Sequence, residues 1–176
     1  MLELYRDFGL SRLSFEQVAR RASVGKAGLY SRWASVEELL IDGLATVAPP
    51  PDIADSGSLR SELRQLALLL VDLYSGQHGR VVIRILLDGS GSPAIRPYFD
   101  RFVEAYVGAA TRIVTRGVER GELDPDHDPS VLLAQMFGGV MIHVLFFTDP
   151  SQPLPRTAAS LFADRMVDTA LAGIQR

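Results

Sequence analysis

The stretch from Ser14 to Trp33 limits the possible folds of this chain more than any other part of its sequence. Ser14 is followed three residues later by Gln17, a pair typical of a capping box at a helix start. An apolar face with helical spacing then follows at Phe15, Val18, Ala19 and Ala22. After the turn-like residues 22–24, a second short helix is predicted over Lys26–Trp33. Two short helices joined by so tight a turn are typical of a helix-turn-helix module.

The second of these helices has an apolar side and a polar side. Val24, Leu29 and Trp33 are expected to point toward the core, and the last two lie one helical turn apart. The opposite side carries small, polar or basic residues, among them Lys26, the only lysine of the chain. Small residues let a helix backbone approach base edges, while lysine and tyrosine side chains reach phosphates or bases. This pattern favours a helix that enters the major groove of DNA.

The same stretch closely resembles the DNA-binding segment of the TetR family of transcriptional regulators. Seven positions carry the resemblance in register, namely Val24, Lys26, Leu29, Tyr30, Ser35, Glu37 and Leu39, and it extends over residues 2–44. The resemblance implies an all-helical fold in which the second helix is the recognition helix. Together with the outward positions, it predicts DNA contacts from Ser14, Lys26, Ala27, Gly28, Tyr30, Ser31 and Arg32.

Five positions depart from the pattern of the family, among them Gly25, which replaces the usual N-cap serine. Trp33 stands where phenylalanine is usual, and Ser23 replaces the turn glycine. Gly28 replaces a Thr or Ser that often touches DNA, and Val36 replaces a lysine that usually meets a phosphate. The last two favour an alternative, a helical ligand-binding or scaffold protein that has lost DNA binding. Retention on random DNA with a steep salt dependence would separate the two functions.

Positive charge is concentrated at the beginning of the chain. Residues 1–34 contain six Lys or Arg against three Asp or Glu, a net charge of +3. The rest contains twelve against eighteen, a net charge of −6, so that the whole chain carries −3. A positive module on a negative body suits a protein whose first part alone meets phosphate.

The remaining sequence predicts further helices and no long strand-like alternation. We expect these helices near residues 35–48, 59–75, 78–87, 94–120, 129–147 and 154–174. Three consecutive prolines, 49–51, end the first of them. The predicted fold is therefore all-α, with a helix-turn-helix domain over residues 1–48 and an effector-binding and dimerisation domain over residues 58–176. The first helix of the family usually begins further upstream, so we expect residues 2–8 to be the end of a clipped helix.

Aromatic and apolar residues of the central helices are candidates for an effector pocket. The predicted lining consists of Tyr74, Leu86, Phe99, Phe102, Tyr106, Met136 and His143, which would suit a small, largely apolar effector. The alternative is that these residues form plain core, and that His143 is a core or interface histidine.

The last two predicted helices are apolar on more than one side. In the family, two such helices from each subunit form a four-helix dimer interface, and the resemblance places Gly138, Gly139 and Met166 in it. A dimer would read a palindromic operator, because one short helix contacts few base pairs. The apolar run 131–147 approaches the length of a membrane span, but Gln135, His143 and the glycine pair interrupt it. We therefore expect a buried helix and no membrane partner.

Several other classes of function find no support in the sequence. Cysteine is absent, the histidines lack the spacing of metal ligands, and no catalytic constellation is recognisable. We predict no metal, no cofactor and no enzymatic activity. The first residues lack the pattern of a signal peptide, which predicts a cytoplasmic protein. The prediction as a whole is a ligand-responsive transcriptional regulator, a homodimeric repressor of a DNA operator.

Overall fold

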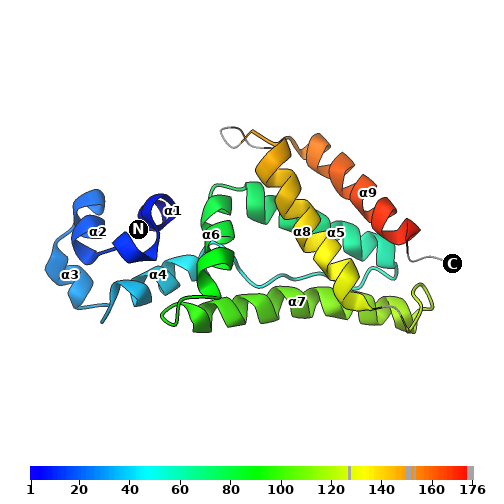
Figure 1. The fold of residues 1–176 in the computed structure, drawn as a ribbon, viewed down its shortest axis with the longest axis horizontal. Helices are drawn as coiled ribbons and strands as arrows, with labels where there is room; N and C mark the ends of the chain where they lie inside the picture. The colour runs from blue at the N-terminus through cyan, green and yellow to red at the C-terminus, as the bar shows by residue number, and fades with distance from the viewer. Residues whose placement is uncertain (127, 150–151, 153, 174–176) are drawn as a thin grey trace. The chain divides into compact units, whose positions relative to one another are not determined.

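The computed structural model describes residues 1–126, 128–149, 152 and 154–173, and all regular secondary structure in this part of the chain is helical (Figure 1). The predicted all-α fold is thereby confirmed. The chain forms two compact units, the first made by Met1–Pro49 and His78–Phe102 and the second by Pro50–Gln77 and Val103–Arg176. The two compact units are not the predicted domains 1–48 and 58–176, since residues 78–102 pack with the first unit. The division into a DNA-binding and an effector-binding domain stays a prediction.

The first unit contains the predicted helix-turn-helix module. Its helices are α1 (Leu2–Phe8), the 3-10 turn η1 (Leu10–Arg12), α2 (Phe15–Ala22), α3 (Lys26–Tyr30), α4 (Val36–Ala45) and α6 (Gly79–Gly89), and α7 (Arg96–Glu119) begins in it. The side chains of Tyr5, Leu40 and Leu44 are fully buried in its core. Two serine caps fix helix starts: Ser14 Oγ accepts from Gln17 N, and Ser35 Oγ accepts from Glu38 N at 3.2 Å.

Polar contacts join α1 to α6 within the first unit. The hydroxyl of Tyr5 donates to Asp88 Oδ2 at 3.1 Å, and Arg84 Nη1 donates to the carbonyl of Arg6 at 3.1 Å. Burial, and then the charge of Asp88, raises the pKa of Tyr5 far above its usual value. Gly9 adopts a positive φ of 73°, and a Cβ at this position would collide with the guanidinium of Arg84. The end of α1 is therefore shaped to accept Arg84.

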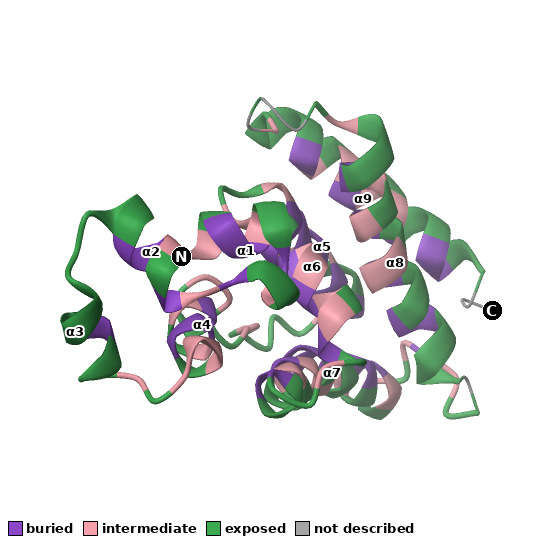
Figure 2. Ribbon diagram, turned by 60° about the vertical axis from the view of Figure 1, so that its left-hand side comes forward, coloured by how far each residue is buried: buried purple, intermediate pink, exposed green. Residues whose placement is uncertain are grey.

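The second unit is built around α5. It consists of α5 (Leu59–Ser75), the rest of α7, α8 (Pro129–Phe147) and α9 (Arg156–Ala172), and α5 packs against both α8 and α9. Its buried residues come from all of these helices, including Leu63, Leu66, Leu70, Ile113, Met136, Val140, Ala163 and Val167. Figure 2 shows buried stretches, in purple, alternating with half-buried and exposed ones along α8 and α9.

Observed helix boundaries differ from the predicted ones mainly at the ends. The recognition helix ends at Tyr30 and not at Trp33, because the amides of Arg32 and Trp33 both donate to the carbonyl of Leu29 and close a turn. Helix α4 ends at Ala45 and not near residue 48, because the amides of Thr46 and Val47 donate to carbonyls three residues back and close a tighter turn. The short turn η1 was not predicted, and the predicted end of the last helix, Ile174, lies outside the described residues.

Candidate nucleic-acid interface

The turn between α2 and α3 depends on one residue with an unusual backbone. Ser23 has φ 56° and ψ 37°, the left-handed conformation, and is the only non-glycine with positive φ among the described residues. This conformation costs an L-residue about 1 kcal/mol, which explains why glycine is usual there. It reverses the chain so that Val24 N donates to Ala19 O at 3.0 Å and α3 begins two residues later.

One residue holds α3 on the core, and the rest of its surface is open. Leu29 is buried, whereas Lys26, Ala27, Gly28 and Tyr30 are exposed (Figure 2). The side chain of Tyr30 is 61% exposed. Its ring nevertheless rests edge-on against Phe15, with 4.7 Å between the ring centroids. The hydroxyl of Tyr30 is thus presented outward on a supported ring.

Two of the three residues expected in the core lie elsewhere. The prediction for Leu29 is confirmed, but Val24 is 48% exposed, because the left-handed Ser23 turns it away from the core. Trp33 is half-buried, and its Nε1 donates to Asp42 Oδ2 at 2.7 Å on α4. Arg32 lies over the Trp33 ring, 5.6 Å from its centroid, so this tryptophan supports a basic side chain at the surface.

The other predicted DNA contacts lie at the ends of the two helices. Ser31 is exposed, and its hydroxyl donates to the carbonyl of Gly28 at 3.1 Å. Ser14 is half-buried and accepts from Gln17 N at 3.3 Å. Its Oγ therefore serves first as the cap of α2.

Ion pairs neutralise half of the basic side chains in residues 1–34. Lys26 Nζ lies 2.7 Å from Glu16 Oε1, Arg21 pairs with Glu3, and Arg6 pairs with Asp7. The hydrogen bond from Lys26, followed by its charge, lowers the pKa of Glu16, which is therefore ionised at neutral pH. Within the described chain, the remaining three form no ion pair: Arg12, Arg20 and Arg32. These three carry the net positive charge of the module.

The Lys26–Glu16 pair borders a hollow between α2 and α3. The hollow has a volume of about 450 Å³ and is lined by Glu16, Ala19, Arg20, Val24 and Lys26. Of these residues only Lys26 was predicted as a site residue. Glu16 and Arg20 are four residues apart on the exposed side of α2, a spacing that could have indicated them.

Most residues predicted to line an effector pocket are buried. In the second unit Tyr74, Tyr106 and Met136 are buried, and burial raises the pKa of Tyr74 to about 12. In the first unit Phe102 is buried, whereas Leu86 and Phe99 are half-buried. A Cβ at Gly89 would lie 2.5 Å from the Phe99 ring, which shows that this ring packs on α6. Their role in binding an effector stays a prediction.

His143 is a residue of α8, and its side chain faces α9. Its ring stacks on Phe162, with 3.7 Å between centroids and an interplanar angle of 9°, and on Phe147 at 6.0 Å. Burial lowers the pKa of His143. His143 therefore takes part in the aromatic packing between α8 and α9. No group of three or more metal-binding side chains occurs among the residues that the structure describes.

The pKa of His143 predicts how stability depends on pH. Because its folded-state pKa lies below the unfolded value of about 6.5, protonation favours the unfolded chain. The contribution of His143 to stability is therefore present above about pH 6.5 and is lost as the pH falls below it. We expect His143→Phe, which keeps the stacking, to lose less thermal stability than wild type between pH 7.5 and 5. Equal losses in melting scans of the two proteins would contradict this.

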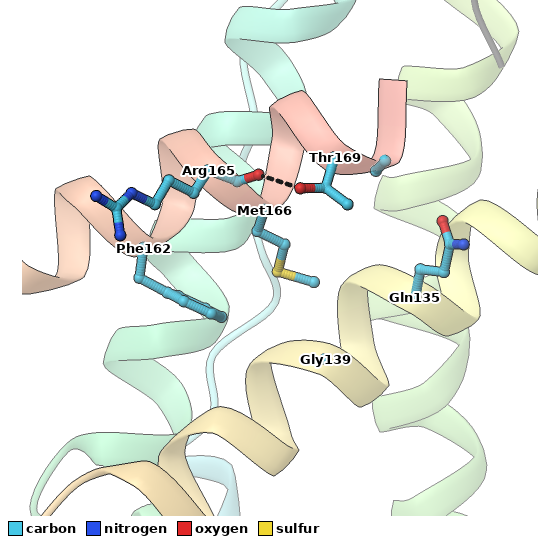
Figure 3. Close-up of a pocket in the computed structure, with 7 residues that line it drawn as sticks. Gln135, Gly139, Phe162, Arg165, Met166 and Thr169 are labelled. Carbon is cyan, nitrogen blue, oxygen red and sulfur yellow. Dashed lines mark hydrogen bonds between the residues drawn. The ribbon is translucent and has the colours of Figure 1, made fainter. Parts of the chain in front are cut away.

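The predicted interface glycines have different surroundings. A Cβ at Gly139 would lie 2.7 Å from Met166 Cε, so this glycine makes room for a side chain of α9 in the same subunit. Gly138 is half-buried, and a Cβ there would meet no atom within 4 Å. Figure 3 shows the pocket of about 390 Å³ at this place, lined by Gln135, Gly139, Phe162, Arg165, Met166, Thr169 and Ala170.

The outer side of α8 is largely apolar and exposed. The expectation that α8 is a buried helix is wrong for this side, because α5 and α9 cover only part of it. Its exposed large residues are Val131, Ile142, Leu145, Phe146 and Phe147, and α9 adds Leu161. By length and composition alone α8 could cross a membrane, and 28% of its most apolar window is buried.

These observations define a class of protein, a helical transcriptional regulator with an N-terminal helix-turn-helix. The chain belongs to the TetR family. The family model described as bacterial regulatory proteins, tetR family, matches residues 2–42, and the model of the tetracyclin repressor-like C-terminal domain matches residues 53–170. The HTH-type transcriptional regulator AqdR of Rhodococcus erythropolis is 34% identical over 157 residues, which are 88% of this chain and 76% of AqdR.

Solved structures share the fold. The transcriptional regulator FadR from Bacillus subtilis, in complex with stearoyl-CoA, superposes with a TM-score of 0.72 at 16% identity, over 99% of this chain and 95% of that one. AibR in complex with isovaleryl coenzyme A and operator DNA superposes with a TM-score of 0.66 at 24% identity, over 96% of this chain and 92% of that one. The predicted family and fold are thereby confirmed.

Proposed function

We propose that this regulator binds a two-fold symmetric DNA operator as a homodimer, with α3 of each subunit in the major groove. The exposed polar face of α3, anchored by Leu29 and by the contact of Tyr30 with Phe15, is the observation that carries this proposal. The unpaired Arg12, Arg20 and Arg32 add positive charge around that face. One α3 has only five residues, so two copies are needed to read a site of useful length.

The second copy would bind at the apolar outer side of α8 and α9. Large apolar patches on a soluble protein usually mark an interface, and the large exposed apolar residues gather on α8, with Leu161 on α9. Each subunit would cover the exposed α8 of its partner, including Gly138, where the backbone is open. Gly139 and Met166 would shape the same face from within the subunit. This arrangement leaves α8 no lipid-facing side, in accord with a cytoplasmic protein.

We propose that the effector of this repressor is a small, largely apolar molecule. The buried aromatic residues of the second unit, Tyr74 and Tyr106, would suit such a ligand. The stearoyl-CoA bound to FadR has a long apolar acyl chain and the isovaleryl coenzyme A bound to AibR a short one, each on a charged coenzyme A. An effector that binds better to the form unable to bind operator weakens operator binding by the same coupling free energy. Acyl-CoA compounds are therefore the first probes for thermal stabilisation of this protein.

Selection of bound sequences from a random DNA pool tests the central proposal. We expect an enriched palindrome whose half-sites are centred about one helical turn apart or a multiple of it. Enrichment of no sequence, together with weak and salt-insensitive retention on DNA, would support the alternative of a scaffold protein without DNA binding.

Two substitutions on α3 test its role as recognition helix. Lys26→Ala and Tyr30→Phe each remove one polar group from an exposed side chain and leave Leu29 in place. We expect each to weaken operator binding by about 1–3 kcal/mol per half-site, with unchanged helicity and oligomeric state. Fluorescence anisotropy with the selected operator measures the change. Wild-type affinity of both variants would show that another surface contacts DNA.

A further inference from the structure

An ion pair on the proposed DNA-binding surface offers a donor and an acceptor side by side. Lys26 Nζ and Glu16 Oε1 are 2.7 Å apart, on the first residue of α3 and in the first turn of α2. Both side chains are more than half exposed. They line the hollow between the two helices and can therefore meet a ligand together.

The major-groove edge of a G·C base pair has the complementary pattern. Guanine presents two acceptors, N7 and O6, and cytosine presents one donor, the N4 amino group. O6 and N4 are themselves hydrogen-bonded within the base pair, at about 2.9 Å, which matches the spacing of the ion pair. An ammonium opposite O6 and a carboxylate opposite N4 would each find a partner without separating from one another.

We propose that Lys26 and Glu16 together read one G·C base pair in each half-site, with Lys26 donating to guanine and Glu16 accepting from cytosine. This inference rests on the proposed function, since it requires α3 in the major groove. Lysine has three donor hydrogens and a carboxylate has about four acceptor sites. Each side chain can therefore bind its base and keep its hydrogen bond to the other side chain. Glu16 is then a specificity-determining residue that was not among the predicted site residues.

The carboxylate would also reject two of the other three base pairs, whereas a T·A pair, with thymine O4 opposite Lys26 and adenine N6 opposite Glu16, lacks only the second acceptor, guanine N7. A reversed C·G pair places guanine O6 opposite Glu16, and an A·T pair in one orientation places thymine O4 there. Each brings an acceptor against a negative charge, and such repulsion is an effective source of specificity. Arg20, on the same hollow and one turn from Glu16, keeps the net charge of the hollow positive and so compensates for an acid near phosphates.

The chain offers a matched control for a test of Glu16. Glu3 is paired with Arg21 at 2.8 Å, is similarly exposed, and does not line the hollow. Glu16→Gln and Glu3→Gln therefore remove the same charge from comparable ion pairs. Exposed ion pairs contribute little to stability, so both variants should fold like wild type, which circular dichroism and melting temperature verify.

The experiment compares wild type with Glu16→Gln, Lys26→Ala and Glu3→Gln in selection from random DNA, followed by affinity measurements on single base-pair variants of the operator. We expect one G·C position per half-site at which wild type discriminates by on the order of ten-fold or more. Both Glu16→Gln and Lys26→Ala should reduce this to about two- to three-fold at that position, whereas Glu3→Gln should not. Affinity of Glu16→Gln for random DNA should rise, because a negative charge is lost.

Three results would overturn the inference. Discrimination by Glu16→Gln could equal wild type at every position, or the two variants could relax different base pairs. Affinity of Glu16→Gln could also fall equally for all sequences, which would give Glu16 only the role of holding Lys26. A wild-type protein that enriches no sequence at all would instead refute the proposed function.

Discussion

Ile142→Arg will convert the proposed dimer into a monomer and will abolish operator binding at concentrations where wild type is saturated. Ile142 is 45% exposed on the outer side of α8, between Gly138 and Phe146. In a dimer formed by this side, each subunit would bury an unpaired guanidinium. Breaking the pairing of a buried charge costs about 3 kcal/mol or more, which corresponds to a dimer at least about 100-fold weaker.

Sedimentation equilibrium and anisotropy with operator DNA measure the two effects. Arg165 already lines the pocket between α8 and α9, and no acidic residue is among the residues that line it. Leu87→Arg is the matched control: Leu87 is a 72% exposed leucine on α6, which belongs to the first unit and not to α8 or α9. It should leave mass and affinity unchanged. A dimeric Ile142→Arg protein would show that the apolar side of α8 has another occupant.

Local sequence signals predicted the helix-turn-helix well because its determinants are local. Capping by Ser14 and burial of Leu29 follow from spacings of three or four residues, and the structure confirms both. The exposure of Val24 could not be predicted in this way. It depends on the left-handed conformation of Ser23, which the residue type does not favour.

Contacts between distant residues were outside the reach of sequence patterns. The tie between α1 and α6 joins Tyr5 to Asp88 across 83 positions, and no spacing along the chain indicates such a pair. The candidate site shows the same limit at shorter range. The lone lysine was predicted to face DNA, but its partner Glu16 is ten residues away on another helix, so the pairing becomes visible only when the turn is built.

The buried Glu62 is the clearest case of a residue that sequence analysis missed. It is the only charged residue of the described chain that is buried, and its carboxylate accepts from Arg116 Nε at 2.9 Å. Arg120 Nη2 lies 3.1 Å from the same carboxylate, and Ser56 N donates to it at 3.3 Å. Asp55 pairs with Arg120 at 3.2 Å, so these contacts fasten the segment before α5 to the end of α7.

Glu62→Gln is expected to lower the free energy of unfolding by about 3 kcal/mol, because it leaves two guanidinium groups without their central partner. This is the low end of the range for broken buried pairs, since Arg116 and Arg120 remain about one-fifth exposed and recover some hydration. The melting temperature should fall by roughly 6–12 °C. Chemical denaturation measures the free energy, with Glu104→Gln, an exposed glutamate on α7, as a control expected within about 0.5 kcal/mol of wild type.

The dependence of stability on salt concentration distinguishes buried ion pairs from exposed ones. Exposed ion pairs such as Arg60–Asp168 are screened at 1 M NaCl, where the Debye length is about 3 Å, whereas Glu62 is fully buried and its contacts are screened much less. The difference in stability between wild type and Glu62→Gln should therefore persist at 1 M NaCl. A difference that disappears in salt would mean that water reaches Glu62 and that the segment before α5 is held by other contacts.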